Sequence, residues 1–251
     1  MELKLGKKET VFDPKTIKMM SIWKDKKLPD FPPKFDGPIY PLQMWGNDKH
    51  GDCVMCGAAN VQTRSEMVEQ KIIIPITEYE VEKQYFVLSG GADSGLVMLD
   101  TAKFWRKHGL FLAKHQYRSY AFASIHDAPE NVKAVVSIIG DAWCGFSMPD
   151  NWKEAVDAGN PWTDTSLPAS PYNGHCMTVG KYDPDWVWVK TWGQWMQMSW
   201  AWFLKYNDER YSIIDAKDSW LKDSPIDVEA LYNLLLECGA DVEAKKWWER
   251  G

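Results

Sequence analysis

The sequence lacks a hydrophobic run long enough to cross a membrane. Its most apolar stretch, residues 132–146, is interrupted by charged residues such as Lys133 and Asp141, whereas a transmembrane helix needs about 18 successive apolar residues. Residues 1–16 contain several charges and lack the apolar segment of a secretory signal. We therefore expect a soluble, cytoplasmic protein with no membrane partner.

Cysteine is scarce, with five residues in a chain of 251. Secreted domains that depend on disulfides have a much higher cysteine content, and an odd number leaves at least one thiol unpaired, which favours a reducing compartment. Basic residues are outnumbered, because 29 Lys and Arg against 35 Asp and Glu give a net charge of −6. This acidic surplus argues against nucleic acid as the main partner. The remaining composition, 45% hydrophobic and 25% charged, is that of a folded globular protein.

The first part of the chain is predicted to form an arm followed by helices. Residues 1–36 are rich in lysine and proline with little periodicity, so we expect an extended N-terminal arm. Residues 37–130 form a mainly helical half, in which apolar residues recur every three or four positions. The helices expected there cover residues 53–70, 78–88 and 96–108. Thr77 and Glu80 form a capping box before the second helix.

The second part of the chain is predicted to be mainly strand. Residues 131–215 form this half, which follows a helix over 129–139 and contains alternating or β-forming residues. The strands expected there cover residues 142–147, 176–179, 186–191 and 211–215. Residues 151–171 are expected to form a long loop, and long ordered loops are often functional. Residues 216–251 have a helical period and predict a C-terminal helical extension.

Cys53 is predicted to open the helix over residues 53–70, directly after Asp52, which we expect to be its N-cap. The free N–H groups and the dipole at a helix N-terminus favour a thiolate and lower the pKa of a cysteine. Cys53 is therefore a candidate nucleophile. The alternative is a buried packing role, which is usual for free cysteines and which we expect for Cys56, Cys144, Cys176 and Cys238.

His175 is predicted to lie at the start of a strand, directly after the long loop. A histidine in this position is able to pair with a thiol as its base. The four other histidines lie beside turns or charged residues and are expected at the surface. These are His50, His108, His115 and His126.

The order and spacing of these residues resemble the papain-like cysteine peptidases over about residues 38–215. That family has a glutamine six residues before its catalytic cysteine, and here Asn47 stands six residues before Cys53. The family's histidine begins a strand that ends in Gly-Tyr, and the strand after His175 ends at Tyr182 with its glycine displaced by one position. The family's next motif is Asn-Ser-Trp-Gly, where this chain has Lys-Thr-Trp-Gly at residues 190–193. Asp93-Ser94-Gly95 is similar to the family's groove-lining glycine loop.

The resemblance implies a papain-like α+β fold, with a helical left domain, an antiparallel β right domain and an active-site cleft between them. It implies that a Cys53 thiolate attacks an amide carbonyl, that His175 transfers the proton, and that Asn47 with the Cys53 N–H stabilises the oxyanion. Lys190, in the place of the family's asparagine, cannot accept a hydrogen bond from an imidazole, whereas Thr191 can. We therefore expect Thr191 to orient His175.

The same resemblance assigns the walls of the cleft and the partners. Ser94, Gly95, Trp143 and Trp192 are expected to line it, together with the loop over residues 151–171. A peptide or protein substrate is expected, with no cofactor and no metal. We also expect a bacterial or phage relative without a long propeptide, associated with the virion if it is a phage protein. The lysine-rich arm is long enough to lie across the surface or mask the cleft.

Three other interpretations of these residues remain open. The replacement of the family's asparagine allows an inactive papain-like module that binds a partner or has a structural role. Cys53 and Cys56 form a C-x-x-C at a helix start, as in thiol–disulfide oxidoreductases. A zinc site that adds His175 and Cys176 has suitable ligand types, but adjacent strand residues point to opposite faces and should not reach one metal.

Overall fold

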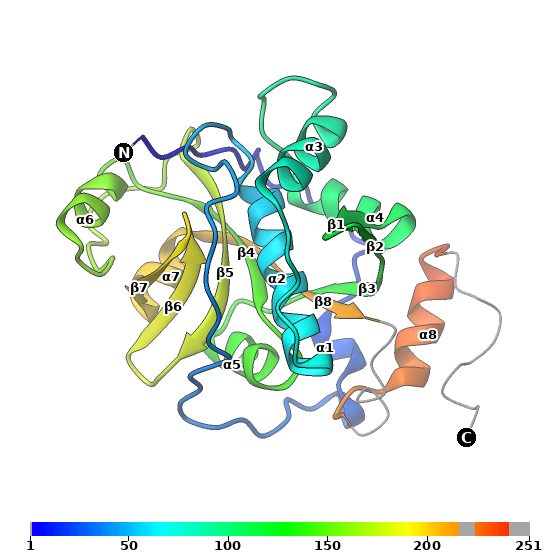
Figure 1. The fold of residues 1–251 in the computed structure, drawn as a ribbon. Helices are drawn as coiled ribbons and strands as arrows, with labels where there is room; N and C mark the ends of the chain where they lie inside the picture. The colour runs from blue at the N-terminus through cyan, green and yellow to red at the C-terminus, as the bar shows by residue number, and fades with distance from the viewer. Residues whose placement is uncertain (1, 216–223, 241–251) are drawn as a thin grey trace.

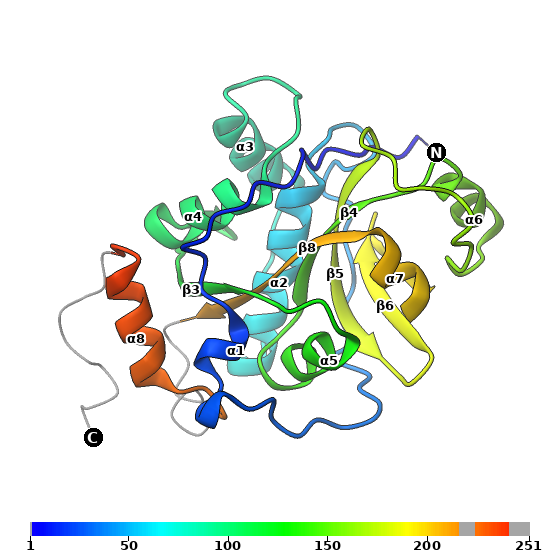
Figure 2. The same cartoon turned by 180° about the vertical axis from the view of Figure 1, so that it is seen from behind.

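The fold is built on a six-stranded antiparallel sheet with helices on both faces (Figure 1, Figure 2). The structure is a computed structural model and describes residues 2–215 and 224–240. The strand order is β3-β8-β4-β5-β6-β7. In chain order the strands are β3 (Ser119–Ser124), β4 (Ala142–Ser147), β5 (Gly174–Tyr182), β6 (Trp186–Thr191), β7 (Gln194–Ser199) and β8 (Asn207–Asp215).

The long helix α2 (Cys53–Gln70) packs against the middle of this sheet, over β4 and β5 (Figure 1). Small residues in its first turns allow this close approach. A Cβ atom on Gly57 would lie 2.6 Å from Trp143 Nε1 and 3.0 Å from Cys176 Sγ, so only glycine fits there. The first twelve residues of α2 are buried on all sides, as expected for a helix in the centre of a protein.

Two further helices and a hairpin complete the helical half. They are α3 (Glu78–Leu88), α4 (Met98–His108) and the pair β1 (Leu110–Leu112) and β2 (His115–Tyr117). The predicted capping box is present, because Thr77 accepts from the Glu80 N–H while the Glu80 carboxylate accepts from the Thr77 N–H. Apolar side chains of these elements form one core with α2.

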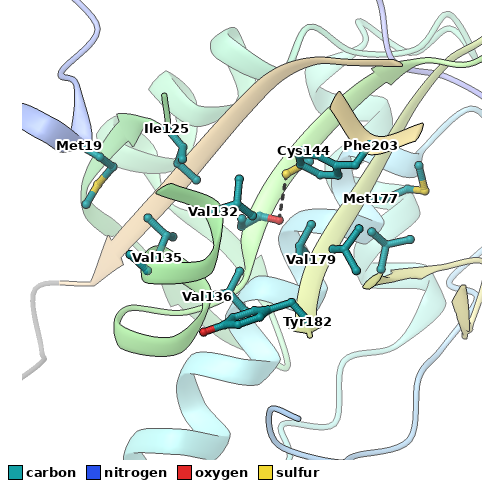
Figure 3. Packing of buried hydrophobic residues seen from close by; sticks show 14 of the residues in the cluster. Met19, Ile125, Val132, Val135, Val136, Cys144, Met177, Val179, Tyr182 and Phe203 are labelled. Carbon is teal, nitrogen blue, oxygen red and sulfur yellow. Dashed lines mark hydrogen bonds between the residues drawn. The ribbon is translucent and has the colours of Figure 1, made fainter. Parts of the chain in front are cut away.

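The opposite face of the sheet carries a second core (Figure 2, Figure 3). Three valines of α5 (Pro129–Ile138), at positions 132, 135 and 136, pack there with residues of β4 and β5 (Figure 3). The helix α7 (Trp200–Tyr206) adds Trp202 and Phe203 to the same core. The mixture of helices with an antiparallel sheet is the α+β architecture predicted from the sequence.

The N-terminal segment crosses the molecule before it reaches the second core. In Figure 2 the dark-blue chain passes the N-terminal end of α2 and then descends to α1 (Met19–Ile22). The short 3-10 helix η1 (Lys24–Lys26) follows, and α1 packs against α8 (Val228–Glu237). The predicted arm therefore contains two short helical turns, and the predicted C-terminal extension contains α8. The division of the chain into four segments remains a prediction. The strand β3 pairs with β8 in the main sheet although it precedes residue 131, where the strand half was expected to begin.

A cluster of charged side chains lies buried between α2 and the sheet. Lys190 donates to Asp141 and to the Tyr40 hydroxyl, 2.5 Å away, and Arg64 Nε lies 3.1 Å from the second Asp141 oxygen. Burial lowers the pKa of Lys190 to about 8, although Asp141 opposes this shift. The Lys190 side chain is therefore buried on one face of β6. The side chain of Thr191, its neighbour, points to the other face.

One expectation about local structure is wrong, and another is met in position only. Residues 151–171 do not form a continuous loop, because the helix α6 (Trp152–Ala158) lies within them and ends at Gly159 in the left-handed conformation. Asp52 occupies the N-cap position of α2, but its side chain accepts no capping hydrogen bond, because its backbone has φ −96° and ψ 14° rather than the extended conformation usual for a capping residue. Within the described residues, none of the helices has the length and apolar character needed to span a membrane.

Candidate active site

Cys53 lies at the first position of α2 with its side chain buried. Its sulfur accepts a hydrogen bond from the Cys176 N–H at 3.4 Å, so the start of α2 and the start of β5 meet at this thiol. Burial raises the pKa of Cys53 to about 12, while hydrogen bonds from the backbone of Cys176 and of Gly6 act in the opposite direction. The buried thiol is therefore protonated at neutral pH.

His175 precedes Cys176 on β5, and its ring is fixed on two sides. Nε2 lies 2.6 Å from Thr191 Oγ1 at the end of β6. The ring stacks on the Trp192 indole, with centroids 4.3 Å apart and an interplanar angle of 16°. Among the described residues, no group hydrogen-bonds to the other nitrogen, Nδ1. Burial lowers the pKa of His175 to about 3, so the imidazole is neutral.

Trp192 owes its position to the turn between β6 and β7. Both central residues of this two-residue turn, Trp192 and Gly193, have positive φ, at 46° and 70°, as a type I′ hairpin requires. A tryptophan is unusual in that conformation. The turn places the indole over His175, and Trp152 of α6 stacks on the indole with centroids 5.2 Å apart.

Two side-chain donors, from Asn47 and Trp192, converge on the backbone carbonyl of Lys4. Asn47 Nδ2 donates to the Lys4 carbonyl at 3.4 Å, and Trp192 Nε1 donates to the same oxygen at 3.2 Å. Asn47 is buried and is also held by a bond from Nδ2 to the His50 carbonyl at 3.2 Å. The site thus binds a peptide carbonyl with the amide that the sequence analysis assigned to oxyanion stabilisation.

That carbonyl belongs to the N-terminal arm, which fills the groove between the two halves of the molecule. The Gly6 and Lys7 N–H groups both donate to the Gly174 carbonyl, at 3.1 and 3.0 Å. On the other side, the Leu96 N–H donates to the Gly6 carbonyl and the Lys8 N–H donates to the Leu96 carbonyl, both at 2.9 Å. The groove therefore holds an extended peptide by backbone hydrogen bonds from both walls.

Glycines make room for this peptide. A Cβ atom on Gly6 would lie 1.8 Å from the Gly51 carbonyl oxygen. Cβ atoms on Gly95 and Gly174 would lie 2.2 Å from the Gly6 oxygen and 2.0 Å from the Lys7 oxygen. Each distance is far below a possible contact, so the arm and both walls of the groove depend on glycine at these positions.

The fold is shared with solved cysteine proteases. The fold is papain-like. The chain is similar to xylellain, a cysteine protease from Xylella fastidiosa, with a TM-score of 0.68 and 15% sequence identity. The match covers 86% of this chain and 97% of xylellain. Procathepsin L 3 from the larval midgut of Tenebrio molitor gives 0.59 over 83% and 75% of the two chains, at 11% identity. The Carica candamarcensis cysteine protease CMS1MS2, in complex with E-64, gives 0.52 over 73% and 99%, at 12% identity.

These similarities establish the fold alone, because the identities are low. No protein-family model matches the chain, and no curated protein matches it by sequence. The recognition of a papain-like fold from the spacing of Cys53, His175 and Trp192 is confirmed by the structural comparison.

The structure brings together most of the residues that the sequence analysis assigned to this papain-like site. Asn47 and Trp192 contact the arm, and the Cys53 sulfur accepts from the backbone of the residue that follows His175. Thr191 and Trp192 hold the His175 ring. Two more, Gly95 and Ser94, lie on the groove wall, where Gly95 faces Gly6 and the Ser94 hydroxyl accepts from Lys8 Nζ at 3.3 Å.

Trp143 is placed differently. It is fully buried under α2 and packs edge-on against Trp105, with ring centroids 6.2 Å apart, and against Tyr211. Its position is that of a core residue, because the helix, and not the groove, covers its indole. The prediction that Trp143 lines the cleft is therefore wrong, because its side chain is buried in the core.

The residues that hold the arm were not predicted from the sequence. Gly6, Gly51 and Gly174 form its tightest contacts, and Lys7 reaches a pair of acidic residues on β8. The isolated glycine in the lysine-rich start of the chain was the available signal, because a glycine in an extended segment often marks a close backbone approach.

The cysteines and carboxylates around the site are candidate disulfide partners and metal ligands. All five cysteines are free, including Cys53 and Cys56. Among residues 2–215 and 224–240, no group of three or more His, Cys, Asp or Glu side chains has the arrangement of a metal site. Burial raises the pKa of Asp52, next to the nucleophile candidate, to about 8, and hydrogen bonds with Cys56 and Asn47 oppose that shift.

Proposed function

We propose that this protein is a cysteine peptidase whose N-terminal arm keeps it inactive by occupying the active site. The observation that carries the proposal is the convergence of Asn47 and Trp192 on a peptide carbonyl of the arm, whose Gly6 N–H reaches the Cys53 sulfur. A groove that binds an extended peptide backbone on both walls suits a peptide or protein substrate.

The residues supply each part of an acyl-transfer reaction. The proton of the Cys53 thiol passes to His175 Nδ1, and the thiolate attacks the carbonyl carbon of the scissile amide. Asn47 Nδ2 and the Cys53 N–H stabilise the oxyanion, since the first N–H groups of a helix have no partner within it. His175 then protonates the amine, which leaves. Water attacks the thioester while His175 takes its proton, and the acid and the free thiol are released.

Thr191 has the role of the orienting residue in this mechanism. Its hydroxyl accepts from His175 Nε2–H, which leaves Nδ1 free to exchange a proton with the thiol. The lysine that replaces the family's asparagine does not disturb this contact, because the Lys190 ammonium is bound to Asp141 and Tyr40 inside the protein. This geometry favours the enzyme over an inactive module.

The closed state disfavours the reactive ion pair. Burial raises the pKa of Cys53 to about 12 and lowers that of His175 to about 3, so both groups are neutral. Departure of the arm admits water to the thiol, which lowers the pKa of Cys53 and raises that of His175. Release of the arm and activation of the nucleophile are thus the same event in this proposal.

Labelling with a thiol-reactive epoxide tests the proposal on the full chain. The Gly6→Val variant, whose side chain collides with the Gly51 carbonyl, should expose the groove and label rapidly at Cys53. The same variant should hydrolyse fluorogenic peptides. Both signals should disappear when Cys53→Ser or His175→Ala is added. If Cys53 in the Gly6→Val protein reacts no faster than a free thiol in a peptide and cleaves nothing, the proposal is wrong.

A further inference from the structure

The side chain of Lys7 occupies a buried pocket against β4 and β8. Only 1% of the side chain is exposed. Its ammonium lies 3.1 Å from Asp208 Oδ2 and 3.4 Å from Glu209 Oε1. The arm itself contributes two further acceptors, the Thr10 hydroxyl and the Lys8 carbonyl, both at 3.1 Å.

The body of the protein, and not the arm, forms the walls of this pocket. The floor is Gly145 of β4, where a Cβ atom would lie 2.2 Å from Lys7 Cε. The Ser147 hydroxyl donates to Asp208 Oδ2 at 2.6 Å, and the Tyr211 hydroxyl donates to Glu209 Oε2 at 3.0 Å. Both carboxylates are therefore held in place by residues that remain when the arm leaves.

A bulge in the sheet explains why two consecutive residues of β8 reach one pocket. Gly145 pairs with Glu209, but Phe146 pairs with Asn207, so Asp208 is the extra residue at this point. In a regular strand, consecutive side chains point to opposite faces. A bulge changes the direction of the side chain that it inserts, and here it brings the second carboxylate to the ammonium.

The pocket without Lys7 would hold two negative groups close together. The Glu209 side chain is only 4% exposed and that of Asp208 is 28% exposed. Burial raises the pKa of Glu209, while the Lys7 ammonium acts to lower it. A buried carboxylate without a cation is costly. Loss of the arm therefore leaves a site that gains free energy when another cation enters.

We propose that this pocket, defined by Gly145, Asp208 and Glu209, is a substrate subsite that selects a lysine or arginine side chain. The inference rests on the proposed peptidase function. The arm gives the position of the selected residue: the Gly6 N–H faces the Cys53 sulfur, and Lys7 is its neighbour. A substrate residue adjacent to the one at the sulfur would place its ammonium or guanidinium where the Lys7 ammonium now lies.

The alternative is that Lys7 only anchors the arm and that the pocket accepts any long side chain. Lysine and norleucine separate the two, because they have the same aliphatic chain and only lysine carries the charge. The full-length Gly6→Val, Lys7→Met variant disrupts the close contact of the arm with Gly51 and removes the Lys7 ammonium. Two pairs of fluorogenic peptides are used, with lysine or norleucine at either of the two positions before the fluorophore.

We expect the lysine peptide to have the higher kcat/KM at one of these positions, by about tenfold or more, because the pocket's acceptors are unpaired with norleucine. Adding Glu209→Gln or Asp208→Asn should reduce this lysine to norleucine ratio by several fold. Asp185→Asn removes the same charge at an exposed site and should leave the ratio unchanged. Equal cleavage of both peptides at both positions overturns the inference and leaves the peptidase intact.

A binding measurement separates failure of the subsite from failure of the function. If no peptide is cleaved, the peptidase proposal fails, and the pocket is judged by calorimetry with the same full-length variant. The probe is a synthetic peptide of residues 2–10, compared with its analogue carrying norleucine in place of Lys7. Tighter binding of the lysine peptide by about tenfold supports a cation pocket, and equal binding overturns it. If the double variant does not fold, Lys7→Met alone is used in the same measurements.

Discussion

His175 and Thr191 are joined by a hydrogen bond of 2.6 Å between Nε2 and Oγ1, across the interior from β5 to the end of β6. The contact uses one ring nitrogen and leaves the other, Nδ1, without a hydrogen-bond partner among the described residues. The residue that bonds His175 is thus Thr191, one position after Lys190, which stands where the papain-like motif has its asparagine.

Replacement of Thr191 tests this contact. Thr191→Val keeps the shape of the side chain but leaves a buried imidazole N–H unpaired, which should lower the free energy of unfolding by about 1–3 kcal/mol. In a Gly6→Val background, it should also lower kcat/KM by about tenfold or more, because the orientation of the ring is lost. Thr191→Ser retains the hydroxyl and serves as the matched control in thermal unfolding and peptide hydrolysis. Equal effects of both variants would contradict the orienting role.

The fit of the arm at Gly6 predicts a strong positional effect on latency. Gly6→Val should raise the rate of Cys53 alkylation, because the new side chain cannot occupy the space next to the Gly51 carbonyl. Glu9→Val introduces the same residue at an exposed position of the same arm and should leave the rate at the wild-type value. Mass spectrometry of the alkylated protein measures both rates. An equal rate in wild type and Gly6→Val would show that the arm does not limit access.

The two neighbouring lysines of the arm should differ in their effect on latency. Lys7→Met removes a buried ammonium that contacts two carboxylates, and one unpaired buried charge costs several kcal/mol. We expect alkylation of Cys53 to be about tenfold faster or more in this variant. Lys8→Met removes an exposed ammonium whose contact among the described residues is with the Ser94 hydroxyl, at 3.3 Å, and exposed contacts contribute little. Its rate should match that of the wild type.

Local patterns in the sequence predicted the elements that carry the site. The bounds of α2, α3, β4 and β6 follow from apolar periodicity and strand alternation, and they are the ones observed. These elements have strong local signals, such as the capping box at Thr77. The spacing of Cys53, His175 and Trp192 then indicated a papain-like fold, which the structural comparison confirms.

The sequence did not reveal the features that depend on contacts between distant segments. The arm occupies the groove because Gly6, Gly95 and Gly174 leave space in three separate segments, and no one of them indicates this alone. The Lys7 pocket likewise requires the bulge that places Asp208 beside Glu209. Trp143 was assigned to the cleft because the chain position of a tryptophan does not say which face of the sheet α2 covers.

Acid should destabilise the folded protein through His175. Burial lowers the pKa of this group to about 3 in the folded state, whereas a histidine in the unfolded chain titrates near 6.5. The unfolded state therefore binds a proton between about pH 6.5 and 3 that the folded state does not, so stability falls as the pH decreases through this window. Urea unfolding at several pH values should show a smaller decrease for His175→Gln than for the wild type, and an unchanged pH dependence would contradict the burial of a neutral imidazole.

Ionisation of Asp52 should make the folded protein less stable as the pH rises, which is the opposite of the effect of His175. Replacement of Asp52 should therefore stabilise the protein. Burial raises the pKa of its carboxyl to about 8, whereas the unfolded value is near 3.9. Between about pH 4 and 8 the folded state holds a proton that the unfolded state has released, so stability falls as the pH rises through this window. Asp52→Asn removes this cost and should raise the free energy of unfolding at pH 7 by up to about 4 kcal/mol.

The gain from Asp52→Asn should be small at pH 4 and grow with pH, because the wild-type carboxyl is neutral in both states only in acid. Asp185→Asn, at an exposed position, is the control and should show no such growth. A difference between Asp52→Asn and wild type that stays constant from pH 4 to pH 8 would mean that the carboxyl ionises normally beside Cys53. In that case Asp52 would be charged next to Cys53 and would oppose formation of its thiolate.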